Sequence, residues 1–131
     1  MFKIFYYMGM MKKYFEELNK YNTKYGKKVI LLWQCGGFYE VYGLKNKEGI
    51  IEGSNIEQFG SICDYLVKEK KTSSTNGKKS QKFKYNNKSY SVTMSGMPVH
   101  GPVESKISKL TQAGYTVALW QQDRNIKDIR E

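Results

Sequence analysis

A glycine pair between two strand-like runs constrains the fold of this chain more than any other feature. Residues 29–33 are all apolar, which predicts a buried strand over residues 28–34. Gly36 and Gly37 follow, and the aromatic and β-branched residues in 38–42 predict a second strand. Because glycine lacks a Cβ atom, the pair lets the backbone bend and approach a ligand closely.

The second predicted strand presents an aromatic ring and a carboxylate on one face. Side chains alternate across a strand, so Phe38 and Glu40 project to the same side, about 6.6 Å apart. The ring is suited to wedge between bases, and the carboxylate accepts a hydrogen bond from a base edge. Tyr39 and Val41 face the other way and are candidates for the core. The alternatives are that Phe38 is a core aromatic and that Glu40 is a solvated strand carboxylate.

Helical and strand patterns alternate along the chain, which predicts an α/β fold. Apolar residues at helical spacing predict a helix over residues 11–25 that Gly26 ends. Ser54 and Glu57 match an S-x-x-E capping box for a second helix, which is expected to end near residue 68 or 69. Its inner face is predicted to comprise Ile56, Phe59, Ile62, Cys63, Leu66 and Val67.

The second half of the chain predicts a hairpin, a helix and a strand. The hairpin joins residues 82–85 to residues 89–94 around a turn at Asn86-Asn87. A helix begins near Pro102, ends at Gly114 and is followed by a strand over residues 115–121.

The length of 131 residues suits one domain, and the net charge of +10 predicts an anionic partner, most simply nucleic acid. The domain is expected over residues 11–122, between an N-terminal extension at 1–10 and a charged tail at 123–131 that frays. Arginine occurs only at Arg124 and Arg130, which favours phosphate contact by lysines over readout of base sequence. The alternative is that the charge serves solubility alone.

A lysine-rich segment over residues 70–88 is predicted to be a basic loop inserted into the domain, mobile over its polar part, residues 70–80. Lys78, Lys79, Lys82 and Lys84 are the candidate phosphate contacts. The alternative is that these lysines are simply solvated.

The two cysteines, Cys35 and Cys63, have no histidine or cysteine at ligand spacing, so no metal site is expected. Reduced thiols are typical of an intracellular protein, which is the expected location. No apolar run approaches membrane-spanning length, and no membrane partner is expected. His100 is the only histidine and precedes a predicted helix, which favours a structural hydrogen bond over catalysis.

Two separated motifs resemble the amino-terminal mismatch-recognition domain of MutS-type DNA mismatch repair proteins. Gly36-Gly37-Phe38-Tyr39-Glu40 resembles the G-D-F-Y-E signature of that family. Residues 95–100 resemble A-G-[IV]-P-Y-H, and residues 103–118 resemble V-E-x-Y-L-x-x-L-x-x-x-G-Y-x-V-A. The resemblance extends from about Met11 to Gln122, and residues 53–57 are most similar to the branch found in giant viruses and coral mitochondria.

The resemblance implies a mixed β-sheet flanked by helices, with double-stranded DNA containing a mismatch as the partner. It implies that Phe38 enters the minor groove and stacks on the mispaired base, to which Glu40 hydrogen-bonds. A mismatch has already lost pairing and stacking, so opening the base step costs less there than in matched DNA. The residues expected to shape the two motifs are Gly36, Gly37, Gly96, Pro98 and His100.

The chain departs from the family pattern at Gly37, Val99 and Gln121, where the family usually has Asp, Tyr and Glu. It also lacks a G-x-x-x-x-G-K-[ST] phosphate loop, so neither ATPase activity nor a cofactor is expected in this domain. ATP and Mg²⁺ are expected only for the ATPase domain of complete family members. Other such domains or a partner chain are expected to complete the assembly.

Two other functions compete with mismatch recognition. A metal-dependent nuclease clusters carboxylates and a lysine around a divalent ion, and Glu104-Ser105-Lys106 and Glu69-Lys70-Lys71 both match an E-x-K string. Both strings are predicted on helices or helix ends, whereas such sites prefer paired strands. A basic interaction module without a DNA role would bind heparin and every form of DNA with equal, weak affinity.

Overall fold

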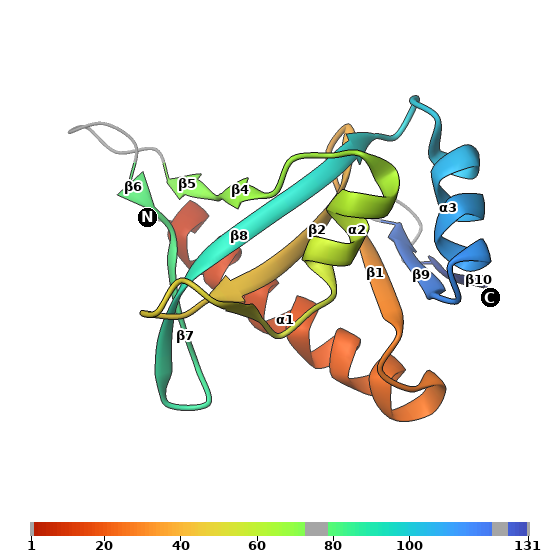
Figure 1. The fold of residues 1–131 in the computed structure, drawn as a ribbon. Coiled ribbons are helices and arrows are strands. Elements are labelled where there is room, and N and C mark those ends of the chain that lie inside the picture. The colour runs from red at the N-terminus through yellow and green to blue at the C-terminus, as the bar shows by residue number, and fades with distance from the viewer. Residues whose placement is uncertain (1, 73–78, 122–125, 131) are drawn as a thin grey trace.

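The computed structural model of this chain describes residues 2–72, 79–121 and 126–130, with side chains for 9–71, 79–121 and 128–130. Within these ranges a mixed β-sheet is flanked by three helices, which confirms the predicted α/β class (Figure 1). The helices are α1 (Phe2–Tyr25), α2 (Ile56–Cys63) and α3 (Val103–Gln112). The strands are β1 (Val29–Cys35), β2 (Phe38–Lys45), β3 (Ile51–Glu52), β4 (Lys68–Glu69), β5 (Lys71–Thr72), β6 (Lys79–Ser80), β7 (Lys82–Tyr85), β8 (Lys88–Pro98), β9 (Thr116–Gln121) and β10 (Ile126–Arg130).

The sheet combines one parallel pair with antiparallel neighbours. Its strand order is β10-β9-β1-β2-β8-β4, with β3 beside β2 and β7 beside β8, while β5 and β6 form a separate ribbon. β1 runs parallel to β9 with Val29 opposite Thr116, and the paired Trp33 and Trp120 stack with ring centroids 4.1 Å apart. Central strands covered on both faces are near-continuously apolar, which explains the composition of residues 29–33.

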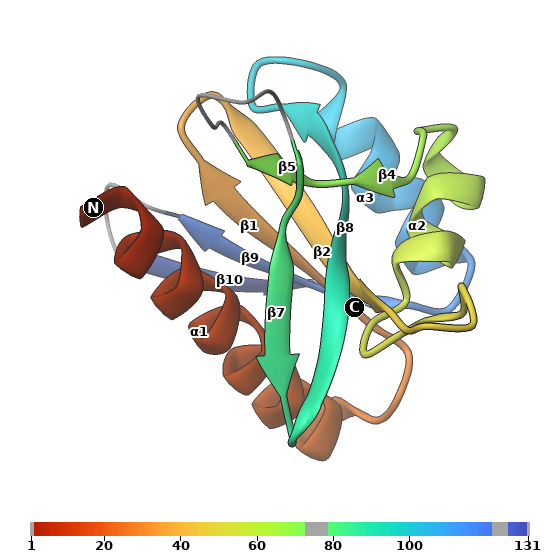
Figure 2. The same ribbon diagram turned by 90° about the vertical axis from the view of Figure 1, so that its left-hand side faces the viewer.

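The sheet has α1 on one face and α2 and α3 on the other (Figure 2), and each face carries its own hydrophobic core. α1 covers one face, where Tyr42 and Leu44 of β2 are buried. α2 and α3 cover the opposite face, where Tyr39 and Val41 are buried, as the alternation of β2 predicted. Even-numbered β2 side chains therefore lie on the α1 face of the sheet, and odd-numbered ones lie on the α2 and α3 face.

Tyr14 fixes α1 to the sheet. Its hydroxyl donates to the Leu31 carbonyl at 2.9 Å and accepts the Tyr42 N–H at 3.3 Å. Gly26 ends α1 as predicted, with a φ of 95° that favours glycine. The helix begins at Phe2, so residues 2–10, expected as a separate extension, continue the helix predicted from residue 11.

The second helix was predicted too long. α2 ends at Cys63 because Asp64 adopts a left-handed conformation with a φ of 60°. The predicted capping box of Ser54 and Glu57 is also wrong. The N-cap is Asn55, and the Ser54 hydroxyl donates to the Tyr42 carbonyl at 2.5 Å. Leu66 and Val67, predicted on the inner face of this helix, therefore lie beyond its end.

The hairpin at Asn86-Asn87 is confirmed, and both residues have positive φ (51° and 64°), as type I′ turns require. Of the loop predicted over residues 70–80, Lys71 and Thr72 pair with Ser80 and Lys79 in a short ribbon, and residues 73–78 lie outside the described residues. The prediction that the tail frays is wrong for residues 126–130, which form β10 beside β9.

Candidate functional site

The site begins at the turn between β1 and β2, where Cys35 pairs with Phe38 across two glycines. Gly36 has a φ of 59°, whereas the φ of Gly37 is not positive. A two-residue hairpin with positive φ at its first central position alone matches the type II′ pattern, which calls for glycine there. The turn therefore depends on Gly36 and leaves position 37 open to other residues.

Phe38 is exposed and Glu40 is buried, the reverse of both alternatives considered for them. Phe38 has a relative exposure of 52%, and Glu40, on the same face of β2, has one of 7%. The Tyr42 hydroxyl donates to Glu40 Oε1 at 2.5 Å, and Tyr42 itself is fully buried. A solvent-facing ring thus lies beside a carboxylate whose position is fixed by a neighbouring donor.

The Glu40 carboxylate also affects the pKa values of two neighbouring groups, a tyrosine hydroxyl and a cysteine thiol. Burial first, and this carboxylate second, raise the pKa of Tyr42 above its ordinary value. The same two causes, in the same order, raise the pKa of the Cys35 thiol. Tyr42 therefore remains a protonated donor to Glu40 at neutral pH.

The two motifs that carry the family resemblance lie side by side. In the β2–β8 register Phe38 is opposite Pro98 and Glu40 is opposite Gly96. A Cβ atom on Gly96 would lie 2.5 Å from the Tyr39 carbonyl oxygen and 3.3 Å from the Glu40 Cα. Glycine at position 96 therefore allows β8 to pack closely against the strand that carries Phe38 and Glu40.

The turn after β8 is tied to the glycine turn. The Val99 N–H donates to the Gly37 carbonyl at 2.9 Å, and the Gly101 N–H donates to the Pro98 carbonyl at 3.0 Å. The His100 side chain is exposed, and no hydrogen bond joins it to any residue that the structure describes. The structural hydrogen bond predicted for His100 is therefore not found in the described part of the chain.

Phe38 and Glu40 line a groove of about 520 Å³. Gly96 of β8 lies between them and the far wall, which is formed by residues 64–66 after α2 and by Lys68 of β4. Ser95 also lines the groove, and its buried hydroxyl has no hydrogen-bond partner among the described residues. The segment after α2 runs alongside β8 (Figure 1).

Three of the predicted phosphate contacts, Lys79, Lys82 and Lys84, do not line this groove. Lys82 is opposite Ser91 on β8, seven residues from the Pro98 that pairs with Phe38, or about 23 Å along the strand. Lys84 lies further in the same direction, Lys79 is exposed on β6, and Lys78 is outside the described residues. Among the described lysines it is Lys68, predicted near a helix end, that lines the groove.

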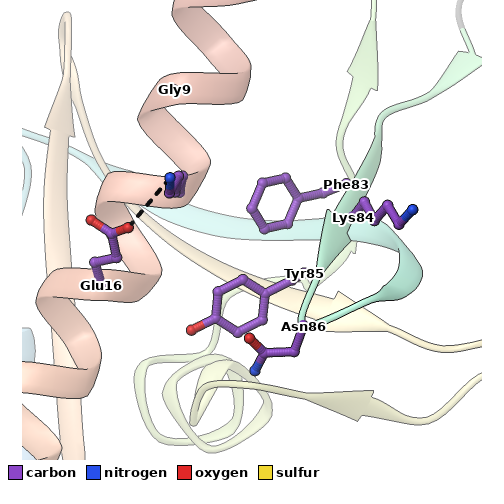
Figure 3. A pocket seen from close by; sticks show the side chains of 7 residues that line it. Gly9, Glu16, Phe83, Lys84, Tyr85 and Asn86 are labelled. Atoms are coloured by element: carbon purple, nitrogen blue, oxygen red, sulfur yellow. Dashed lines mark ion pairs between the residues drawn. The ribbon is translucent and has the colours of Figure 1, made fainter.

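A second cleft of about 720 Å³ lies between α1 and β7. Phe83 and Tyr85 form its apolar wall on β7, and Glu16 lies on α1, with its carboxylate directed away from the two rings (Figure 3). Its charged side chains, Lys12, Glu16 and Lys84, are exposed, and Lys12 and Glu16 form an ion pair at 3.9 Å. Active sites typically hold buried titratable groups, whereas the charged side chains that line this cleft are exposed.

The acidic residues of the two E-x-K strings are held by basic partners. Glu104 pairs with Arg130, and Glu69 pairs with Lys45 at 3.5 Å and with Lys71 at 3.4 Å. Across residues 9–71, 79–121 and 128–130, no three His, Cys, Asp or Glu side chains gather where they could hold a metal ion. No helix in the described ranges combines the length and apolarity needed to cross a membrane.

Comparison with known proteins adds no family assignment: no protein-family model matches the chain, and no curated protein is significantly similar to it.

Tyr42, Leu66 and Lys68 are residues of this site that sequence reasoning missed. Tyr42 had a usable signal, since it lies two residues after Glu40 and on the same face of the strand. Leu66 and Lys68 were assigned to a helix that ends before them.

Proposed function

We propose that this chain binds double-stranded DNA and recognises mismatched base pairs by inserting Phe38 into the minor groove, as part of DNA mismatch repair. The observation that carries the proposal is the 52% exposure of Phe38 beside a Glu40 carboxylate that Tyr42 holds in place. An exposed aromatic at the end of a short hairpin is able to unstack a base step, which kinks the duplex. The resemblance to the MutS mismatch-recognition domain supports the same roles for these residues.

Selectivity in this proposal comes from the cost of deforming DNA. Unstacking a base step costs a few kcal/mol, and a mismatched step has lost part of that stability beforehand. The net charge of +10 attracts every duplex through its phosphates and supplies affinity without discrimination. The described residues bind and test DNA, while catalysis belongs to other domains or to a partner chain.

Competition between matched and single-mismatch duplexes at moderate salt tests the role of Phe38. Because base–aromatic stacking contributes about 1–3 kcal/mol, Phe38→Ala is expected to weaken binding of the mismatched duplex about tenfold and to leave matched binding nearly unchanged. Phe38→Tyr keeps the ring and serves as the matched control. An unchanged preference for the mismatch in Phe38→Ala contradicts the proposed wedge.

Glu40 is assigned discrimination in the same proposal, because a carboxylate near phosphates opposes binding unless a base edge donates to it. Glu40→Gln keeps the shape of the side chain and removes the charge. We expect it to bind matched duplex more tightly than the wild-type protein and to narrow the difference between the two duplexes. Equal weakening of both duplexes would show that Glu40 only supports the fold.

A further inference from the structure

Leu66 is the most exposed large apolar side chain in the described part of the chain, at 86%. Phe38 at 52% and Ile50 at 60% are the other two such residues there. A single exposed leucine is ordinary, but Leu66 and Phe38 line the same groove, whereas Ile50 does not. Two of the three exposed apolar side chains thus border the site assigned to DNA.

The backbone that carries Leu66 is fixed from inside the helix layer. The Tyr65 N–H donates to the Gly60 carbonyl at 2.9 Å, the closure typical of a Schellman motif after the left-handed Asp64. A Cβ atom on Gly60 would lie 2.8 Å from the Tyr65 carbonyl oxygen, so the chain packs directly on the helix there. The Tyr65 ring stacks on Phe59 with centroids 6.0 Å apart.

Lys106 of α3 adds a second attachment. Its ammonium group donates to the Cys63 carbonyl at 2.7 Å and lies 5.1 Å from the centroid of the Tyr65 ring. Cys63 and Tyr65, which both precede Leu66, are therefore restrained, and the exposed Leu66 side chain extends from a backbone that has little freedom left to lose. An apolar contact made by such a residue costs less ordering entropy than one made by a mobile loop.

The charge beside Leu66 suits a nucleic-acid strand. Lys68, two residues later, is exposed on β4 and lines the same groove. Glu40 and Asp64 line it as well; Asp64 is exposed on the same wall as Lys68, and Glu40 is buried on β2. A phosphate is accommodated next to Lys68, and the apolar edge of a sugar is accommodated against Leu66.

We propose that Leu66 is a second apolar contact for the DNA that Phe38 opens, packing on the sugar edges of a widened minor groove. This inference rests on the proposed function. Both side chains line the groove, and β8 lies between β2, which carries Phe38, and β4, which follows Leu66. In this proposal the DNA contacts both only after the duplex has bent away from the wedge. Leu66 therefore adds affinity to the mismatched, kinked duplex more than to the matched, straight one.

Alanine substitution at Leu66 tests this inference, with Ile50→Ala as the matched control because Ile50 is also exposed and lies away from the groove. We expect Leu66→Ala to weaken binding of a single-mismatch duplex about three- to tenfold and of a matched duplex less than about twofold. Ile50→Ala should leave both unchanged. Both side chains are exposed, so the melting temperatures of the two variants should match that of the wild-type protein.

Two results overturn the inference. One is Leu66→Ala binding both duplexes as Ile50→Ala does, and the other is equal weakening of matched and mismatched binding. Phe38→Ala, measured alongside, separates this failure from failure of the proposed function. If Phe38→Ala loses the mismatch preference while Leu66→Ala keeps it in full, only the role of Leu66 is wrong; if Phe38→Ala keeps the preference, the wedge itself is wrong.

Discussion

The close packing of Gly96 against β2 predicts that alanine substitutions at Gly96, Gly36 and Gly37 have unequal effects on the free energy of unfolding. A methyl group at position 96 would meet the Tyr39 carbonyl oxygen at 2.5 Å, and that oxygen belongs to backbone that cannot rotate away. Forcing a methyl group into a well-packed interior typically costs about 1–3 kcal/mol. Gly96→Ala is therefore expected to lower the free energy of unfolding by about that amount.

The same contact links stability to recognition. The added methyl would also lie 3.3 Å from the Glu40 Cα, so the strand that carries Glu40 and Phe38 must shift to admit it. We expect Gly96→Ala to lose part of its preference for mismatched DNA as well as stability. Urea unfolding followed by circular dichroism measures the first effect, and duplex competition measures the second.

The glycine turn supplies the controls for this experiment. Gly36 and Gly37 both have open space where a Cβ atom would be added, but only Gly36 has a positive φ. Gly36→Ala is expected to cost about 1–3 kcal/mol through backbone strain alone. Gly37→Ala should change stability by no more than about 0.5 kcal/mol. If Gly37→Ala destabilised the protein as much as Gly96→Ala, the steric reasoning would be refuted.

Three further predictions concern the buried hydrogen bond between Tyr42 and Glu40, the alkaline titration of two buried tyrosines, and the surface lysines. Tyr42→Phe removes the hydroxyl that donates to the Glu40 carboxylate and should lower the free energy of unfolding in urea by about 1.5–3 kcal/mol; an unchanged midpoint would show that this bond is dispensable. Burial raises the pKa of Tyr14 and of Tyr42, so above about pH 10 the unfolded chain loses these protons first. Stability should then fall with rising pH by up to about 1.4 kcal/mol per unit for each tyrosine, and less steeply in Tyr42→Phe, as alkaline melting curves would reveal. Lys68→Gln should reduce the salt slope of DNA binding by about 1 whereas Lys82→Gln leaves it unchanged, and the opposite result would place the phosphates on β7.

Local signals predicted most of the fold because they coincide with its tertiary structure. The glycine pair, the Asn86-Asn87 turn and the helix-ending Gly26 and Gly114 each impose a backbone conformation through their own residues. The alternation in β2 likewise separated Tyr39 and Val41 from the face of Phe38. These features are local, so one sequence is sufficient to find them.

The errors occurred where contacts distant in sequence decide the structure. Apolar spacing continues past Cys63, but the chain leaves the helix there because Tyr65 and Val67 pack back toward Gly60 and the helix layer. Leu66 was consequently predicted inside and lies outside. β10 has a charged sequence that gives no strand signal, and it forms because β9 offers an unpaired edge. Neither the exposure of Leu66 nor the formation of β10 can be predicted from the local sequence pattern.

The parallel pair of β1 and β9 also affects how the chain is made. β1 leaves the ribosome well before β9, yet Val29 through Trp33 pair with Thr116 through Trp120 of that later strand. During that interval the nascent chain carries an uncovered apolar strand that lacks one of its two neighbours. Productive synthesis therefore depends on keeping this strand from associating with other chains until the matching strand arrives.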